Sequence, residues 1–293
     1  MKLFNKLLCT AGVALAMTGT AQAGAVLNNW VFNPLGAGFA TGQTINEYLD
    51  VNGNAFIQLT PTGGTNFSFA EHAVFNISQA DSNGALFPIT YPGGNITATF
   101  SAFGTGNFGG AFTFGGGTIT MYHSLLPLYG STAGIYGADQ GAAIATFTVL
   151  PGLGGGLVQA DGSPTSNGQI SVFAKATTPG GMAPGYFFRS TGTDIANEDI
   201  LSFAFTNANT VGSPTQRLVD EVACQYAGYV SPSCPGGAGY TNNLNPSAGD
   251  LRFFVSNNGQ FKLAEVPEPA SLALLGIALL GVGSVSRKRS RKA

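Results

Sequence analysis

Histidine is the commonest general base in enzymes, and this chain of 293 residues contains two of them, His72 and His123. Ser124 follows His123, so the residue types of a nucleophile and its base stand side by side. His123 and Ser124 adjoin a segment that alternates like a β-strand, and neighbouring side chains on a strand point to opposite faces. They therefore cannot pair with each other. The sequence also carries no zinc-protease, serine-hydrolase or phosphate-loop motif.

Acidic residues gather at two places where carboxylate chemistry would be sought. Asp194, Glu198 and Asp199 form one group, and Asp220 and Glu221 form the other. Glycoside hydrolysis needs two carboxyl groups about 5–9.5 Å apart across a cleft. Sequence neighbours on a strand diverge, so neither group supplies such a pair by itself. We predict that the chain is not an enzyme and uses no cofactor, with a secreted polysaccharide hydrolase as an alternative.

A weak calcium candidate lies early in the chain, where Asp50, Asn52 and Asn54 offer side-chain oxygens at every second position. Glu47 would be a fourth ligand. An EF-hand loop needs glycine at its sixth position and glutamate at its twelfth, whereas this segment has glycine at the fourth and Pro61 at the twelfth. The alternative is a polar turn between two strands, and no other metal site is expected.

Two further patterns could bind small molecules or sugars. The run from Gly104 to Gly109 matches the G-x-G-x-x-G dinucleotide fingerprint, but that motif needs a helix after it. A strand-like segment follows instead, and a chain with 43 glycines matches by chance. Trp30, Tyr229 and Tyr240 would stack on sugar rings if they are exposed, which is the basis of a lectin-like alternative.

Cys224 and Cys234 are the cysteines that remain once the N-terminal leader is set aside. They lie in a loop rich in proline and glycine, and an exported chain meets oxidising conditions. We predict a disulfide between them. A metal pair is the alternative, but no histidine or further cysteine lies nearby in the sequence.

Alternation with a period of two dominates the middle of the chain, as in Ile96–Ala102, Ala143–Val149 and Leu201–Thr206. Further strands are predicted at Ala55–Thr60, Phe67–Ala70, Ala73–Ser78, Ile170–Ala174, Tyr186–Arg189 and Leu251–Ser256. We therefore predict an all-β, antiparallel body, either a β-sandwich or a jelly-roll-like fold. If the body held two β domains, residues 151–168 would be the boundary.

Clusters of Gly, Pro, Asn and Asp predict the turns between these strands. Gly115–Gly117 is predicted to turn a hairpin between Phe112–Phe114 and Thr118–Tyr122. Other loops are predicted at Pro61–Gly64, Asp81–Gly84, Pro92–Asn95, Pro151–Gly156, Asp161–Pro164, Pro179–Gly181 and Asn257–Gly259.

Charge is scarce, at 9% of residues, which argues against a coiled coil or a charged disordered chain. Between the two ends, the body keeps five basic and 13 acidic residues, a net charge of −8. A negative body repels phosphate backbones, so we expect no nucleic-acid partner.

The N-terminus has the order of a secretory leader. Two lysines precede the apolar run Leu7–Met17, and Ala21 and Ala23 supply the small residues that signal peptidase reads. We predict a signal helix over residues 1–23 with cleavage before Gly24.

The C-terminus has the order of a membrane anchor. Residues 270–286 are uncharged and rich in leucine, and as a helix they would extend about 26 Å. Arg287, Lys288 and Arg289 follow at once and would hold this end in the cytoplasm. We predict a transmembrane helix over 270–286 and a basic end over 287–293. The body then lies on the far side of the inner membrane from the cytoplasm.

Val266, Pro267, Glu268 and Pro269 stand directly before that helix. Two prolines remove backbone donors, so the tripeptide should stand extended where an enzyme can bind it. The order of Pro-Glu-Pro, short apolar span and basic end resembles the PEP-CTERM sorting tail. The alternative is a plain one-pass membrane anchor that follows a proline-rich segment. The resemblance implies that an exosortase recognises Pro267, Glu268 and Pro269. It also implies a Gram-negative bacterium that makes exopolysaccharide.

The body is itself similar to the floc-associated PEP-CTERM proteins, at Ile45–Asp50, Asn95–Gly104 and Gly115–Tyr122. This resemblance implies a non-enzymatic role in holding cells and exopolysaccharide together. We therefore predict an exported surface or extracellular-matrix protein that supports floc or biofilm formation. The predicted domains are a signal peptide (1–23), an exported β-rich domain (24–265) and a sorting tail (266–293).

Overall fold

The computed structural model describes residues 25–82, 85–88, 95–176, 180–230, 234 and 251–266. Val26–Ala264 forms one compact unit. The predicted signal peptide, and the sorting tail from Pro267 onward, lie outside the described residues. Within the described ranges, no helix is long and apolar enough to cross a membrane.

Antiparallel strands make up most of this unit. The strands are β1 (Trp30–Phe32), β2 (Gln43–Ile45), β3 (Tyr48–Gly63), β4 (Asn66–Ser82), β5 (Ala85–Pro88), β6 (Asn95–Asn107), β7 (Ala111–Ser124), β8 (Ala142–Leu157), β9 (Gly168–Ala176), β10 (Phe187–Phe188), β11 (Ile200–Val211) and β12 (Arg252–Glu265). The helical segments are η1 (Phe39–Thr41), α2 (Gln216–Leu218) and the π-helical η2 (Val219–Tyr226), which continues α2.

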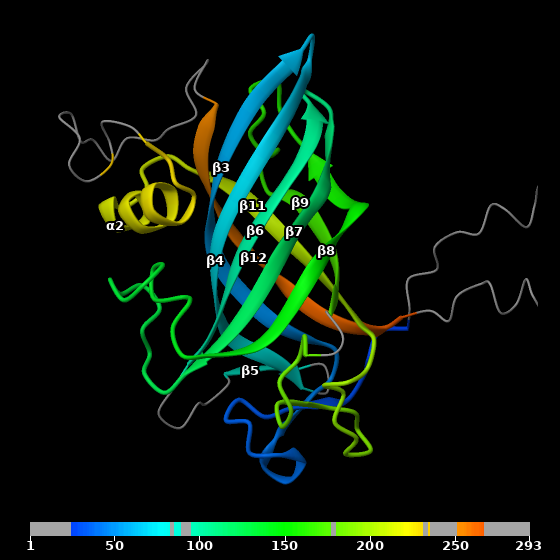
Figure 1. The fold of residues 1–293 in the computed structure, drawn as a ribbon. Coiled ribbons are helices and arrows are strands. Elements are labelled where there is room, and N and C mark those ends of the chain that lie inside the picture. Colours follow the sequence, from blue (N-terminus) through cyan, green and yellow to red (C-terminus); the bar gives the residue numbers. More distant parts are fainter. Residues whose placement is uncertain are drawn as a thin grey trace, which may run out of the picture. The chain divides into compact units, whose positions relative to one another are not determined.

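Eight long strands form a single sheet in the order β3-β12-β11-β9-β8-β7-β6-β4. The two strands at the ends of this order, β3 and β4, also pair with each other, from Leu49 opposite Ala80 to Gly63 opposite Asn66. The sheet therefore closes into a cylinder (Figure 1). The short β5 extends β4, and a separate small sheet has the order β10-β1-β2.

The antiparallel β architecture is confirmed, but the packing of two sheets expected for a sandwich or jelly roll is not found. One sheet instead curls until its end strands meet, which removes the exposed edges that an open sheet would leave. Strand alternation with one buried face is the same in both arrangements, so it could not distinguish them. The proposed boundary at 151–168 lies within one compact unit, since β8 extends into it to Leu157 and β9, which begins at Gly168, is in the same sheet.

The main core fills the interior of the cylinder. On β9, every second residue from Gly168 to Ala176 is buried, and β12 alternates in the same way from Phe253 to Leu263. Aromatic rings from neighbouring strands meet edge to face inside. The Phe69 ring lies 5.4 Å from that of Phe112 and 5.6 Å from that of Phe114. Edge-to-face contacts are a favourable geometry for aromatic pairs.

A second cluster lies outside the cylinder, where the α2–η2 helix covers part of the sheet. Leu218, Val219 and Val222 pack against the outward-facing Phe56 and Phe254 of β3 and β12. The sequence analysis did not predict this helix. Burial of its apolar face explains why three adjacent strands carry large apolar side chains on their outer surface: Phe56 on β3, Val74 on β4 and Phe254 on β12.

Three predicted turns are instead continuous strand. Gly115–Gly117 lies inside β7, Pro151–Gly156 inside β8 and Asn257–Gly259 inside β12. The register shifts between Thr113 and Thr118 on β7, so the glycines form an irregularity in the strand. Glycine admits the bulge and the bend that a closing sheet needs. The turn predicted at Asp161–Pro164 is confirmed between β8 and β9, whereas at Pro61–Gly64 the strand β3 continues to Gly63 and the turn follows at Gly64 and Thr65.

Candidate functional site

A polar groove of about 550 Å³ runs across the outer surface of four adjacent strands, and asparagine dominates its lining. We call it the asparagine groove. Its outer side chains are Asn52 and Asn54 on β3, Asn76 on β4, Asn207 and Asn209 on β11, and Ser256 and Asn258 on β12, with Asn167 and Tyr129 from adjoining loops. None of these residues carries a formal charge.

Strand alternation and register bring these amides together. On β3, Leu49, Val51 and Ala55 are buried, so Asn52 and Asn54 project to the outer face. Asn52 stands opposite Asn258 on one side and opposite Asn76 on the other. Directly opposed side chains on one face lie about 5 Å apart. Residues separated by about two hundred positions in the chain thus form one row.

Hydrogen bonds order this row. The Asn258 amide donates to the side-chain oxygen of Asn52, and the Asn95 amide donates to that of Asn76 at 2.5 Å. The Tyr129 hydroxyl donates to the backbone oxygen of Val74 at 3.3 Å, and burial raises the pKa of Tyr129, so the hydroxyl stays protonated. The groove is therefore a neutral surface with its amides partly held in place.

An amide side chain both donates and accepts hydrogen bonds, which suits a ligand that presents many hydroxyl groups. The groove volume falls within the range of about 300–1,000 Å³ that is usual for small-molecule sites. The arrangement can therefore hold a neutral polyhydroxyl molecule without a metal or a charged side chain.

This site was not predicted from the sequence, although the spacing of its residues contains a signal for it. Asn52 and Asn54, Asn207 and Asn209, and Ser256 and Asn258 each stand two residues apart. That spacing places each pair on one face of a strand. The third pair was not identified because Asn258 falls inside the turn that was predicted at Asn257–Gly259.

Two members of the calcium candidate belong to this row instead. Asp50, Asn52 and Asn54 lie in succession on the extended β3 and not in a loop that could wrap around an ion. The side-chain oxygen of Asn52 accepts from Asn258, and Glu47 forms an ion pair with Lys262. In the described ranges, no cluster of three acidic, histidine or cysteine side chains could hold a metal ion.

The histidines are held by aromatic neighbours. The His72 ring lies 4.9 Å from the ring of Tyr226, and the His123 Nδ1 lies 3.4 Å from the Tyr186 hydroxyl. Burial lowers the pKa of both imidazoles. The Ser124 hydroxyl accepts from the backbone N–H of Leu126 at 3.1 Å, so a turn at the end of β7 uses it.

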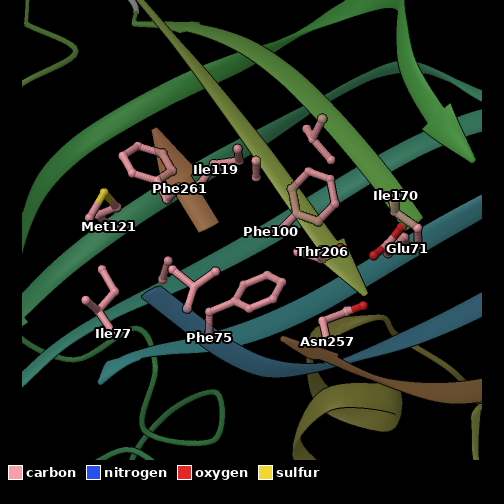
Figure 2. Close-up of a pocket in the computed structure, with 14 residues that line it drawn as sticks. Glu71, Phe75, Ile77, Phe100, Ile119, Met121, Ile170, Thr206, Asn257 and Phe261 are labelled. Carbon is pink, nitrogen blue, oxygen red and sulfur yellow. The ribbon is translucent and has the colours of Figure 1, made fainter. Parts of the chain in front are cut away.

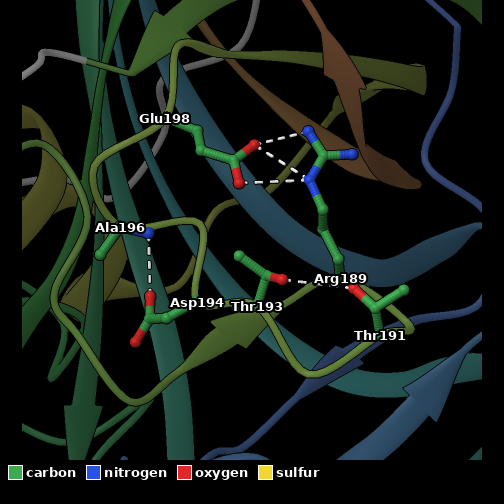
Figure 3. Close-up of polar contacts among 6 residues, drawn as sticks. All are labelled: Arg189, Thr191, Thr193, Asp194, Ala196 and Glu198. Atoms are coloured by element: carbon green, nitrogen blue, oxygen red, sulfur yellow. Dashed lines mark hydrogen bonds and ion pairs between the residues drawn. The ribbon is translucent and has the colours of Figure 1, made fainter.

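The first acidic group organises a loop (Figure 3). The Arg189 guanidinium contacts Glu198 with two nitrogens, at 2.5 and 3.1 Å from one carboxylate oxygen. Asp194 accepts from the backbone N–H groups of Gly185 and Ala196 at 2.7 and 2.9 Å. Asp199 forms an ion pair with Lys175 at 3.1 Å. These carboxylates diverge to separate partners and do not face each other across a cleft.

The second acidic group lies on the η2 helix beside the disulfide. Glu221 is 3.8 Å from Arg217, one helical turn earlier. The predicted disulfide between Cys224 and Cys234 is present, with Cα atoms 5.7 Å apart, and it ties the end of η2 to the chain that follows.

The glycine fingerprint and the aromatic candidates serve packing. Gly104 and Gly106 of the fingerprint lie at the end of β6 and Gly109 in the turn after it, and a Cβ on Gly104 would come within 2.5 Å of the Phe69 ring. Trp30 is only 1% exposed, so the condition on which it would stack on sugars is not met. Tyr229 packs against Phe56 and Arg252, and Tyr240 lies outside the described residues.

One family model matches the chain, and it describes the PEP-CTERM protein-sorting motif over residues 265–289. The match covers the predicted recognition residues Pro267, Glu268 and Pro269 and the basic residues Arg287, Lys288 and Arg289. No curated protein and no solved structure matches the chain. The motif implies processing by an exosortase and placement at the cell surface or outside the cell. The chain therefore carries the PEP-CTERM sorting motif, which implies an exported substrate of the exosortase sorting system.

Proposed function

We propose that this PEP-CTERM protein is a non-enzymatic matrix protein that binds the exopolysaccharide of its Gram-negative host and supports floc or biofilm formation. Signal peptidase removes the leader, the tail holds the chain in the inner membrane, and an exosortase then processes it. The asparagine groove is the observation that carries the role of the body. Its neutral amides match the hydroxyl groups of a polysaccharide.

A lectin-like module is the second candidate, and the groove favours it because it is a single defined site of bounded volume. A matrix protein that works through many weak contacts would bind polysaccharide over much of its surface. Saturation at one site per chain would support the lectin-like form. Binding that does not saturate, and that survives loss of the groove, would support dispersed contacts.

The test compares two double variants of the exported protein purified from the producing strain. Asn207→Ala with Asn258→Ala removes exposed amides from the groove, and Thr118→Ala with Thr148→Ala removes a cross-strand pair of exposed hydroxyls on β7 and β8. Each lost hydrogen bond contributes about 1 kcal/mol. Two lost hydrogen bonds total about 2 kcal/mol, so we expect the groove variant to bind the strain's exopolysaccharide about 30-fold more weakly.

The threonine variant should change that affinity by less than about twofold, because it lies outside the groove. Unchanged binding in the groove variant would overturn the assignment of the site. A reducing-end assay on the same polysaccharide tests the non-enzymatic role, and new reducing ends that appear with time would contradict it.

A further inference from the structure

The interior of the cylinder contains a cavity of about 60 Å³, and Asn257 is the lining residue that it shares with the groove on the outer surface. Side chains of β3, β4, β6, β7, β9, β11 and β12 line it, and they are apolar except for Glu71, Thr206 and Asn257. Figure 2 shows these three residues toward one end of the cavity. A second cavity of about 30 Å³ also has Glu71 and Ile170 in its lining. Glu71 therefore stands at the junction of two apolar spaces.

Two of these polar side chains, Glu71 and Asn257, have carboxyl or amide oxygens that no described residue pairs with. Glu71 is 5% exposed, and no hydrogen bond or ion pair joins its carboxyl to another described residue. Asn257 is equally buried, and its Oδ1 has no hydrogen-bond partner among those residues. Buried polar groups are normally paired, because an unpaired one costs about 1–3 kcal/mol. A carboxyl and a carboxamide left free at one end of an apolar cavity point to a ligand that pairs with them.

We propose that this cavity binds a small apolar primary amine, with its ammonium group on Glu71 and Asn257 and its hydrocarbon part among Phe75, Phe100 and Phe261. The Glu71 carboxylate and the Asn257 Oδ1 are acceptors, so they require a donor. An ammonium group brings three donors and the positive charge that offsets a carboxylate. No lysine or arginine lines either cavity, so the protein itself supplies no such charge there.

The cavity size limits the ligand. One water-sized group needs about 10–15 Å³ of such a volume, so 60 Å³ accommodates about four to six non-hydrogen atoms. n-Butylamine, with a four-carbon chain and one nitrogen, has that size, and n-butanol has the same shape without the charge.

Affinity for the amine should depend on pH through Glu71. It is the titratable side chain that lines the two cavities, and burial raises its pKa to about 7. An alkylamine remains protonated to about pH 10, as lysine does. Only the carboxylate form can pair with it. Binding should therefore be strongest at pH 8 and about 100-fold weaker at pH 5, where about one carboxyl in a hundred is ionised.

The experiment is calorimetric titration of the exported protein with n-butylamine and n-butanol at pH 8 and pH 5. We expect butylamine to bind at least about tenfold more tightly than butanol at pH 8. Glu71→Gln should weaken butylamine binding at least tenfold and leave butanol nearly unchanged. Glu221→Gln is the matched control, because Glu221 is a buried glutamate on the η2 helix, outside both cavity linings.

Two results would overturn the proposal. Equal affinities for the amine and the alcohol, unaffected by Glu71→Gln, would exclude a charge-paired site. Absence of binding by both probes would mean that the cavity holds only water. Circular dichroism of each variant separates loss of the site from loss of the fold. Ala98→Leu, which fills the cavity lining without touching Glu71, should abolish binding of both probes. Neither result depends on polysaccharide binding at the groove.

Discussion

Glu71 occupies a position where strand alternation calls for an apolar side chain. Its inward-facing neighbours on β4 include Phe69 and Ala73, both buried in the main core. The apolar pattern predicted two strands, Phe67–Ala70 and Ala73–Ser78, whereas β4 is continuous from Asn66 to Ser82. The ladder with β3 and β6 holds the strand through this position. Backbone pairing therefore places a carboxyl in the core despite the cost of burying it.

That burial makes the stability of the protein depend on pH. The pKa of Glu71 is about 7 in the folded state and 4.5 in the unfolded chain, so between these values the folded state binds more protons. Its contribution to stability is complete below pH 4.5 and is lost as pH rises through 7, a change of about 3 kcal/mol. Glu71→Gln should remove this dependence and make the protein more stable than wild type at pH 8. Urea denaturation at pH 5 and pH 8 measures it, and a parallel pH response in both proteins would contradict the assignment.

The α2–η2 helix is the element that the sequence analysis missed, and its signals are local. Thr215 is the N-cap, and its side-chain oxygen accepts from the backbone N–H of Leu218 at 3.3 Å. Leu218, Val219 and Val222 form the apolar face, and Gly228 has a φ of +65° just past the end. An isolated helix of about three turns is only marginally stable in water. This helix therefore depends on packing against the sheet for its stability.

The cap provides a test at the scale of this element. Thr215→Ala removes the side-chain acceptor and should lower the free energy of unfolding by about 1 kcal/mol. Thr215→Ser keeps the hydroxyl and should remain within a few tenths of a kcal/mol of wild type. Thermal unfolding of the three proteins makes the comparison, and equal destabilisation by alanine and serine would show that the cap does not contribute.

At the scale of the whole molecule, closure of the sheet decides both candidate sites. Pairing of β3 with β4 and with β12 encloses the cavity and aligns asparagines from distant parts of the chain on the outside. Outward and inward faces thus offer different chemistry, with neutral amides on one and a buried carboxyl on the other. The sorting tail follows β12 directly, since the matched motif begins at Glu265, the last residue of that strand.

Processing of the tail is the prediction that concerns the entire chain. In cells with an exosortase, the exported product should lack the basic end from Arg287 to Ala293, because the enzyme acts at the matched motif. In cells without it, the chain should remain unprocessed in the membrane fraction. Mass spectrometry of both fractions, with a tag placed after Gly24, provides the measurement. Equal processing in the two strains, or an exported product complete through Ala293, would contradict the prediction.

Local patterns were enough to predict the antiparallel strands, the disulfide and the sorting motif. Each depends on residues close together in sequence: alternation within a strand, two cysteines in one loop, or a Pro-Glu-Pro run before an apolar span. Only the tertiary structure decided that the sheet closes, that glycine-rich stretches such as Gly115–Gly117 continue as strand, and that Asn52 meets Asn258. These features depend on register and curvature between distant segments, and a residue's immediate neighbours do not determine what stands opposite it across a sheet.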